Sequence, residues 1–168
     1  MTLHESIAFT RWDSPLGPMR LAASPQGLLG AWFDGDRHGP AAWLTTCWQR
    51  VNGNPLLDEA ARQLQAYFDQ TLRNFELPLD LRLGTGFQQR AWQALLGIDY
   101  GATITYGTLA ARLDNPAAAR AAGAAIGRNP LSIIVPCHRV LGASGALTGY
   151  AGGLERKVAL LRLEGALI

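Results

Sequence analysis

Residues 7–33 read IAFTRWDSPLGPMRLAASPQGLLGAWF, three apolar runs separated by two turn signals. The turn signals, Ser14-Pro15-Leu16-Gly17-Pro18 and Ser24-Pro25-Gln26-Gly27, are rich in residues that reverse the chain. Because connections this short join antiparallel neighbours, the stretch predicts a β-meander. Its strands are predicted at residues 7–12, 19–23 and 28–33.

The rest of the first half predicts one helix and one further strand. A polar loop at 34–40 precedes an ambiguous stretch, and Asn54-Pro55 then opens a helix. The apolar face of this helix consists of Ala60, Leu64, Tyr67, Phe68 and Leu72. Residues 75–83 alternate apolar residues with polar residues or proline, which predicts a strand, and Pro78 favours a sheet edge.

Beyond a joint at Gly84-Thr85-Gly86 the pattern changes to helices. One apolar stripe consists of Phe87, Ala91, Trp92, Leu95 and Leu96. Thr105 can cap a helix over 106–113, and Asn115 can cap a second helix over 116–127. Two short helices joined by a tight turn predict a helix-turn-helix.

The last third predicts a strand, a loop and a helix. Residues 131–135 form an apolar strand, 142–153 a glycine-rich loop, and 154–164 a helix that Gly165 ends. The fold class is therefore α+β. We expect an antiparallel β-sheet with a helix in a domain at residues 1–84, and a mostly helical domain with the helix-turn-helix at residues 85–168.

Composition argues against several classes of protein. A hydrophobic content of 48% with 17% charged residues is typical of a soluble globular chain. The sequence begins without a basic patch and apolar run, and its apolar runs are too short to cross a bilayer, so we expect a cytoplasmic protein without membrane contact. Cys47 and Cys137 lack CxxC spacing, so we expect no disulfide framework, no metal and no cofactor.

Charge is divided unevenly along the chain. Residues 1–84 carry seven Lys and Arg against nine Asp and Glu, whereas residues 85–168 carry eight against four. A basic surface for nucleic acid is therefore expected in the second half.

Cys137 followed at once by His138 is the pattern of a nucleophile with its base. A small buried cysteine without chemistry is the alternative. Adjacent side chains on a strand point to opposite faces, so we expect a bridging water between thiol and imidazole, and a lowered pKa for the thiol. The imidazole also needs a carboxylate, and the candidates are Asp99, Asp114, Glu155 and Glu164.

Four stretches together resemble the O6-alkylguanine-DNA alkyltransferases. They are Asn129-Pro130, residues 131–135, Pro136-Cys137-His138-Arg139-Val140 and Gly149-Tyr150-Ala151-Gly152-Gly153. The resemblance covers residues 85–168, and residues 1–84 are similar to the family only in their order of strands and then helix. It implies a ribonuclease H-like first half and a single-turnover transfer of the alkyl group from O6-alkylguanine in double-stranded DNA to Cys137.

The resemblance implies roles for the residues around the thiol. His138 is the water-relayed base, Glu164 is the carboxylate that holds it, and Asn129 braces the turn that carries Cys137. Val140, Tyr150 and Ala151 form the substrate pocket.

The resemblance also implies that the target base leaves the duplex, since the alkyl carbon cannot be reached in line while the base is stacked. Tyr106 hydrogen-bonds the guanine and helps its phosphate rotate, and Arg120 fills the gap in the stack. Asn115 is a further DNA contact. Arg128 stands where a small residue is expected, and we interpret it as a surface arginine rather than a phosphate contact.

The resemblance implies a monomer in solution. It leaves open whether the protein binds cooperatively along DNA and whether O4-alkylthymine is a second substrate. Three other functions also stay open. An alkyltransferase-like sensor would hold the lesion without repair, although Cys137 argues against it. A helix-turn-helix regulator with a structural cysteine would bind a specific sequence, and a thiol hydrolase would turn over on an ester or amide. The alanine-rich stretch around Arg120 has packing between helices as its alternative role.

Overall fold

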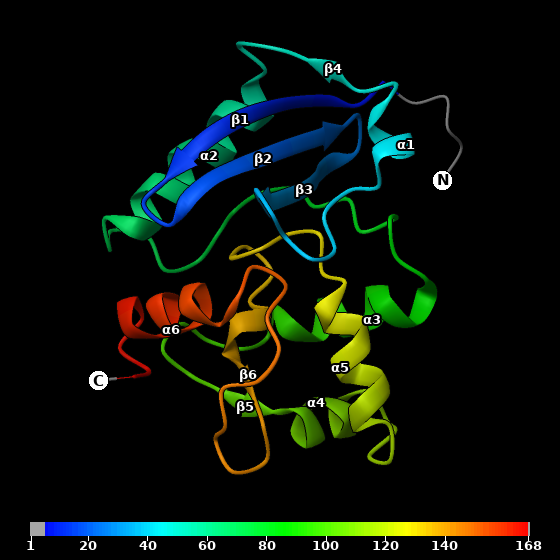
Figure 1. Cartoon of the computed structure of the whole chain (residues 1–168), viewed down its shortest axis with the longest axis vertical. Helices are drawn as coiled ribbons and strands as arrows, with labels where there is room; N and C mark the ends of the chain where they lie inside the picture. The colour runs from blue at the N-terminus through cyan, green and yellow to red at the C-terminus, as the bar shows by residue number, and fades with distance from the viewer. Residues whose placement is uncertain (1–5, 168) are drawn as a thin grey trace.

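The computed structural model describes residues 6–167 and places a four-stranded sheet against a layer of helices (Figure 1). The strand order is β3-β2-β1-β4. The strands β1 (Ala8–Ser14), β2 (Gly17–Ser24) and β3 (Gly27–Phe33) pair antiparallel in sequence order, which confirms the predicted meander. The short β4 (Gln49–Arg50), in the stretch that the sequence left ambiguous, adds a parallel strand beside β1.

The helix α2 (Pro55–Phe68) covers one face of this sheet (Figure 1). The Asn54 side chain accepts the backbone N–H groups of Leu56 and Leu57, so the predicted start is confirmed. The buried face of α2 includes Leu57, Ala60, Leu64 and Tyr67. Leu72 was wrongly assigned to this helix, because the chain reverses at Gln70, whose φ is 61°, and Leu72 lies beyond the last turn.

The strand predicted at residues 75–83 is wrong. Only Leu79 pairs, in a single parallel bridge with Leu28 at the free edge of β3. The flanking hydrogen bonds run from Leu28 N–H to the Pro78 carbonyl and from Asp80 N–H to the Leu28 carbonyl, both 2.8 Å. Pro78 has no N–H to extend the ladder, and the Asp80 side chain, which accepts from Ser24 and Arg82, turns the chain away.

The second half contains four helices that the sequence predicts, with two corrections. They are α3 (Gly86–Leu95), α4 (Tyr106–Arg112), α5 (Ala119–Gly127) and α6 (Leu154–Leu163). Thr85 forms a capping box with Gln88, and Thr105 caps α4 as predicted. Leu96 was wrongly placed on the apolar stripe of α3, since it lies past the helix end and is 40% exposed.

The pair α4 and α5 is the helix-turn-helix, and its turn differs from the prediction. The helix α5 begins at Ala119 and not at residue 116, and its N-cap residue Ala118 offers no side-chain hydrogen bond. Asp114 adopts a left-handed conformation with φ 58°, and Ala118 N–H then bonds the Asn115 carbonyl in a turn. The predicted cap by the Asn115 side chain is therefore wrong, and Asn115 is exposed.

Residues 131–135 also do not form the predicted strand. Leu131 makes one bridge to Ala31 of β3, and the chain then turns at Ile133, which has the unusual φ of 74° for a β-branched residue. Cys137–Arg139 follow as a single 3-10 turn. The short strands β5 (Ile104–Thr105) and β6 (Val140–Leu141), which no sequence signal indicated, pair in parallel just after it.

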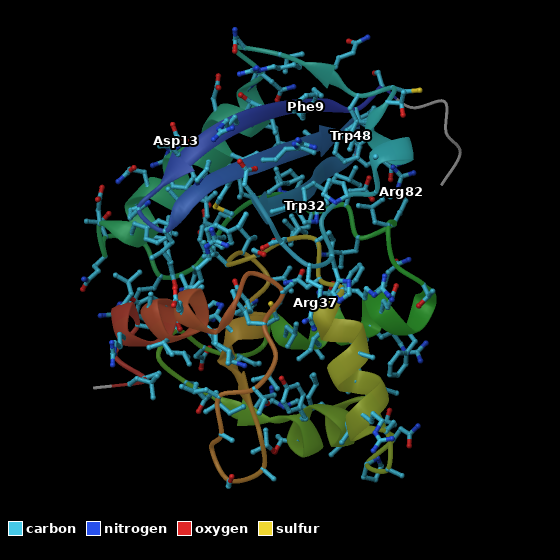
Figure 2. All side chains as sticks on the ribbon, viewed as in Figure 1. Phe9, Asp13, Trp32, Arg37, Trp48 and Arg82 are labelled. Atoms are coloured by element: carbon cyan, nitrogen blue, oxygen red, sulfur yellow. The ribbon has the colours of Figure 1, made fainter. Side chains whose placement is uncertain are left out.

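One apolar core joins the sheet to the helices. Its members include Leu21 of β2, Leu64 of α2, Trp92 of α3 and Leu160 of α6. The other face of the sheet packs a smaller cluster in which Trp32 and Trp48 lie with ring centroids 5.9 Å apart (Figure 2). The remaining short helix is α1 (Ala42–Thr45). Within residues 6–167, none of the helices has the length and apolar character needed to cross a bilayer.

Gly30 tests the packing of this second cluster. A Cβ at Gly30 would overlap the Trp32 indole, which is itself buried and confined by Trp48. We expect Gly30→Ala to lower the free energy of unfolding by about 2–3 kcal/mol, measured by urea denaturation. Gly86→Ala is the control, because a Cβ there meets open space at the start of α3. Equal midpoints for the two variants would contradict the packing.

Candidate active site

Cys137 lies in the wall of a cavity of about 110 Å³ between the loop after β3, the helix-turn-helix and the glycine-rich loop. The cavity is lined by residues that include Arg37, His38, Tyr106, Cys137, Tyr150 and Ala151. Three larger hollows, of about 120, 300 and 570 Å³, are lined by neither cysteine nor histidine. The cavity at Cys137 is therefore the candidate site, although it is not the largest.

Asn129 fixes the turn that carries the thiol. Its side-chain amide donates to Cys137 Sγ at 3.2 Å and to the Val135 carbonyl at 2.8 Å, and its oxygen accepts Leu131 N–H at 2.9 Å. These bonds span the loop that contains the positive φ of Ile133. A buried amide that bonds both ends of the loop holds the sulfur in place and gives it a hydrogen-bond donor.

Cys137 and His138 occupy consecutive positions of the 3-10 turn, so the strand geometry assumed from the sequence is wrong. Residues in such a turn are rotated by about 120° from their neighbours rather than placed on opposite faces. His138 is fully buried, with Nε2 2.7 Å from Glu164 Oε1. Its Nδ1 has no hydrogen-bond partner among the described residues, so the thiol and the imidazole are not directly bonded.

Glu164 is the carboxylate that the structure selects from the four candidates. Besides His138, it accepts the Tyr67 hydroxyl at 2.7 Å and two bonds from the Arg139 guanidinium at 2.9 Å. Burial acts to raise the pKa of Glu164, but the hydrogen bonds from His138 and Arg139 outweigh it and lower the pKa to about 2. The carboxylate is thus charged, and the natural tautomer of His138 carries its proton on Nε2.

Sequence reasoning missed Tyr67 and Arg139 as members of this network. Tyr67 belongs to the apolar face of α2, and its hydroxyl meets Glu164 across 97 residues of chain. Arg139 was part of the family motif, but its bonds to Glu164 and to the Ile98 carbonyl depend on the tertiary fold. The only sequence signal was the polar end of each side chain within an otherwise apolar stretch.

Burial raises the pKa of Cys137 to about 11, although the hydrogen bond from Asn129 and the charge of Lys157 oppose it. The expected lowering of this pKa is therefore not found. Burial also lowers the pKa of His138, against the effect of Glu164. At neutral pH both groups are uncharged in the free protein.

Lys157 is a buried cation close to the site that the sequence did not indicate. Its Nζ donates to the Val140 carbonyl at 2.6 Å and to the Thr148 carbonyl at 2.9 Å. Burial lowers the pKa of Lys157 to about 8. The Tyr106 hydroxyl donates to the same Thr148 carbonyl at 3.1 Å, so Lys157 and Tyr106 together hold the glycine-rich loop beside the cavity.

The other predicted site residues divide between the cavity and the surface. Tyr106, Tyr150 and Ala151 line the cavity, whereas the Val140 side chain is fully buried and is not among the lining residues. Arg120 and Asn115 are exposed on the helix-turn-helix.

No group of three or more His, Cys, Asp or Glu side chains within residues 6–167 is arranged to hold a metal ion.

Comparisons with known proteins agree with this geometry. Residues 86–166 match the family model of the 6-O-methylguanine DNA methyltransferase DNA binding domain, and residues 7–81 match that of the ribonuclease-like domain of the same family. A methylated-DNA–protein-cysteine methyltransferase of Mycobacterium bovis is 50% identical over 94% of this chain and 92% of its own length. One of Methanosarcina acetivorans is 46% identical over 92% of this chain and 96% of its own.

Solved structures give the same result. The crystal structure of Mycobacterium tuberculosis OGT in complex with DNA is 48% identical, with a TM-score of 0.85 over 94% of this chain and 92% of that one. The O6-methylguanine-DNA methyltransferase of Pyrococcus kodakaraensis, at 24% identity and a TM-score of 0.65 over 95% of this chain and 99% of that one, shares the fold.

The network at Glu164 predicts how stability depends on pH. A carboxylate whose pKa falls from 4.5 to about 2 on folding stabilises the fold above its unfolded pKa, and this contribution is lost as pH falls toward 2. We expect Glu164→Gln to destabilise the protein by about 3 kcal/mol at pH 7, because Arg139 then stays buried without its anion. The difference from the unmodified protein should shrink between pH 5 and pH 2, as measured by urea unfolding at each pH. A difference independent of pH would mean that Glu164 is not charged.

Proposed function

This chain belongs to the 6-O-methylguanine DNA methyltransferase family, and from that premise we propose that it repairs DNA by moving the alkyl group of O6-alkylguanine onto its own Cys137. One observation carries the proposal: the only cysteine in the cavity accepts a hydrogen bond from Asn129 and is followed directly by a His138 held against Glu164. The enzyme is a methylated-DNA–protein-cysteine methyltransferase that acts once.

The reaction is a displacement at the alkyl carbon. Cys137 Sγ attacks that carbon, the bond from carbon to O6 breaks, and the electron pair leaves with the guanine. A ring nitrogen of the guanine takes up a proton from water, which balances the proton that the thiol gives up. Because the thiol is protonated at neutral pH, its proton must leave before or during the attack. His138 Nδ1 is a buried acceptor without a partner among the described residues, and a water carries the proton to it since no direct bond joins the two groups.

Glu164 sets the tautomer of His138 that can accept the proton. With Nε2–H donated to the carboxylate, Nδ1 carries the lone pair, and the negative charge stabilises the imidazolium that forms. Asn129 keeps the sulfur in line and its amide hydrogen stabilises the developing thiolate.

DNA reaches the site through the helix-turn-helix. The face of α5 near the cavity is smooth: Gly123 lies against the Tyr106 ring, where an added Cβ would be 3.5 Å away. Tyr106 then hydrogen-bonds the flipped guanine and assists rotation of its phosphate, while Arg120 fills the emptied place in the stack and Asn115 contacts the DNA. Tyr150 and Ala151 form the pocket wall, and Val140 contributes through its carbonyl bond to Lys157.

The acceptor is consumed in the reaction. A thioether offers no good leaving group, and the second cysteine, Cys47, is exposed and lies outside the cavity lining. The protein therefore works stoichiometrically, without a cofactor. We place it in the cytoplasm as a monomer, with alkylated double-stranded DNA as its partner. The same assays can test cooperative binding along DNA and activity on O4-alkylthymine.

Cys137→Ser tests the acceptor. The hydroxyl keeps the shape of the thiol but is far less acidic, so we expect transfer to fall by at least a thousandfold while binding to alkylated duplex persists. Intact-mass measurement after incubation with O6-methylguanine duplex shows the outcome: the unmodified protein gains one methyl group and stops. Repeated turnover on an ester or amide would instead indicate a hydrolase, and binding that depends on sequence rather than on the lesion would indicate a regulator.

Arg120→Ala separates base flipping from simple charge attraction. If the guanidinium replaces the flipped base, the single-turnover rate on duplex should fall at least tenfold more than the rate with free O6-methylguanine, which needs no extrusion. Arg120→Lys keeps the charge but not the planar group, and it should restore binding more fully than rate. Equal losses on duplex and free base would assign Arg120 and its alanine-rich helix to packing.

A further inference from the structure

The loop after β3 forms part of the cavity wall, although it belongs to the half of the chain with more acidic than basic residues. Arg37 N–H donates to the Ala151 carbonyl at 3.1 Å, which joins this loop to the glycine-rich loop. Asp36 folds the loop back by accepting Phe33 N–H at 3.1 Å. Figure 2 shows Arg37 between the sheet and the adjoining end of α5. The position of the loop is therefore fixed from both sides.

Three basic side chains meet at this place, and we call Arg37, His38 and Arg128 the cationic rim. Arg37 and His38 line the cavity that holds Cys137, and Arg128 caps the end of α5 directly before Asn129. The charges of Arg128 and Arg37 both lower the pKa of His38, which puts each guanidinium within electrostatic range of the imidazole. The rim therefore draws on both halves of the chain.

The rim has no internal counter-charge. Within residues 6–167 neither Arg37 nor Arg128 forms an ion pair with a carboxylate, and both are exposed. The acidic side chains on the loop have other contacts. Asp34 pairs with Arg11 at 3.5 Å, and Asp36 accepts Phe33 N–H through one oxygen and lies within electrostatic range of Arg156, while its other oxygen is buried without a partner among the described residues. Three convergent donors without an anion, at the edge of a site for a nucleotide, fit an anionic ligand.

We propose that the cationic rim binds a phosphodiester of the DNA strand that carries the alkylated guanine, and so holds the backbone at the cavity mouth while the base is inside. The proposal rests on the proposed function, and it assigns DNA contact to a loop outside the helix-turn-helix. It also reverses the interpretation of Arg128 as an ordinary surface residue.

The position of Arg128 on α5 supports this assignment. Arg128 follows Arg120 by eight residues, which is about 12 Å along a helix axis. Arg120 is exposed in the first turn of α5, and Arg128 lies at the cavity end of the same helix. A strand whose base enters the cavity must carry its phosphates past the mouth, where Arg37, His38 and Arg128 are placed to donate.

His38 makes the contact sensitive to pH. Burial, and then the charges of Arg128 and Arg37, lower the pKa of His38, so the free protein holds it neutral at pH 7. The groups around it are Arg37, Asp34 and Asp36 on its own loop, Arg128 from α5, and Tyr106, Tyr150 and Cys137 in the cavity wall. A bound phosphodiester adds a negative charge and raises the pKa of His38, so binding takes up a proton and tightens as pH falls.

The salt dependence of duplex binding by the full-length protein tests the role of Arg128. The measured quantity is the concentration of O6-methylguanine duplex that gives half the maximal single-turnover rate, at salt concentrations from 50 to 200 mM. We expect Arg128→Ala to raise it about fivefold at low salt and to reduce the slope of its logarithm against log salt by about 1. Arg50→Ala, an exposed arginine on β4, is the matched control and should leave the slope unchanged. Equal slopes for the two variants would overturn the proposal.

His38→Gln tests whether His38 takes up a proton when duplex binds. The unmodified protein should bind duplex about threefold more tightly at pH 6 than at pH 7.5, and this gain should disappear in His38→Gln. If the gain survives in His38→Gln, His38 does not take up the proton and does not belong to the rim. Asp36 would then be the group that titrates, because burial raises its pKa to about 6.

Reaction with free O6-methylguanine separates the two proposals. A rim that binds backbone predicts that, at low salt, Arg128→Ala loses about fivefold more rate on dilute duplex than on the free base, which has no phosphate. Equal losses on both would assign Arg128 to the fold. Failure of the unmodified protein to gain a methyl group from either substrate would overturn the proposed function itself.

Discussion

The buried carboxylate of Glu164 is the interaction on which the rest of the site depends. It accepts hydrogen bonds from Tyr67 in the first half of the chain and from His138 and Arg139 in the second. A charge without solvent is tolerated only when its lone pairs are satisfied, so the positions of these three donors are tied to one another. The orientation of the imidazole is thus set by α2, a helix that contributes nothing to the cavity lining. Sheet and helices have to be assembled before the base is competent.

This arrangement keeps both Cys137 and His138 uncharged in the free protein. Burial holds Cys137 as a neutral thiol and His138 as a neutral imidazole, because in a dry site each charged form alone would be unfavourable. In the proposed transfer, moving the proton from sulfur to His138 creates a pair of opposite charges next to the Glu164 carboxylate and the Asn129 amide, which are hydrogen-bonded to these two groups. A protein that reacts once benefits from such coupling, since a free thiolate would be open to oxidation before any lesion was found.

The sequence predicted correctly those helices and strands whose ends are set by residues close by in the chain. The meander, the caps at Asn54 and Thr105 and the end of α6 follow from turn residues and side-chain caps that act over a few positions. The errors lie where a distant contact decides the backbone. Residues 131–135 are apolar enough for a strand, yet they form a turn because Asn129 and the edge of β3 bind them at both ends. Tyr67 likewise has an ordinary place on an apolar helix face, and only the tertiary fold places its hydroxyl on Glu164.

The same limit applies to charge. The count of basic and acidic residues in each half assigned the nucleic-acid surface to residues 85–168, and the family model of the DNA binding domain matches residues 86–166. A count does not show where each charge lies in the fold, or that Asp34 pairs with Arg11. What a ligand meets is the local field, and the charges of Arg37 and Arg128 both act on His38 beside the cavity. The first half of the chain has a net negative charge, but it can still supply part of a surface for an anion, because its fold places two basic side chains, Arg37 and His38, at the cavity.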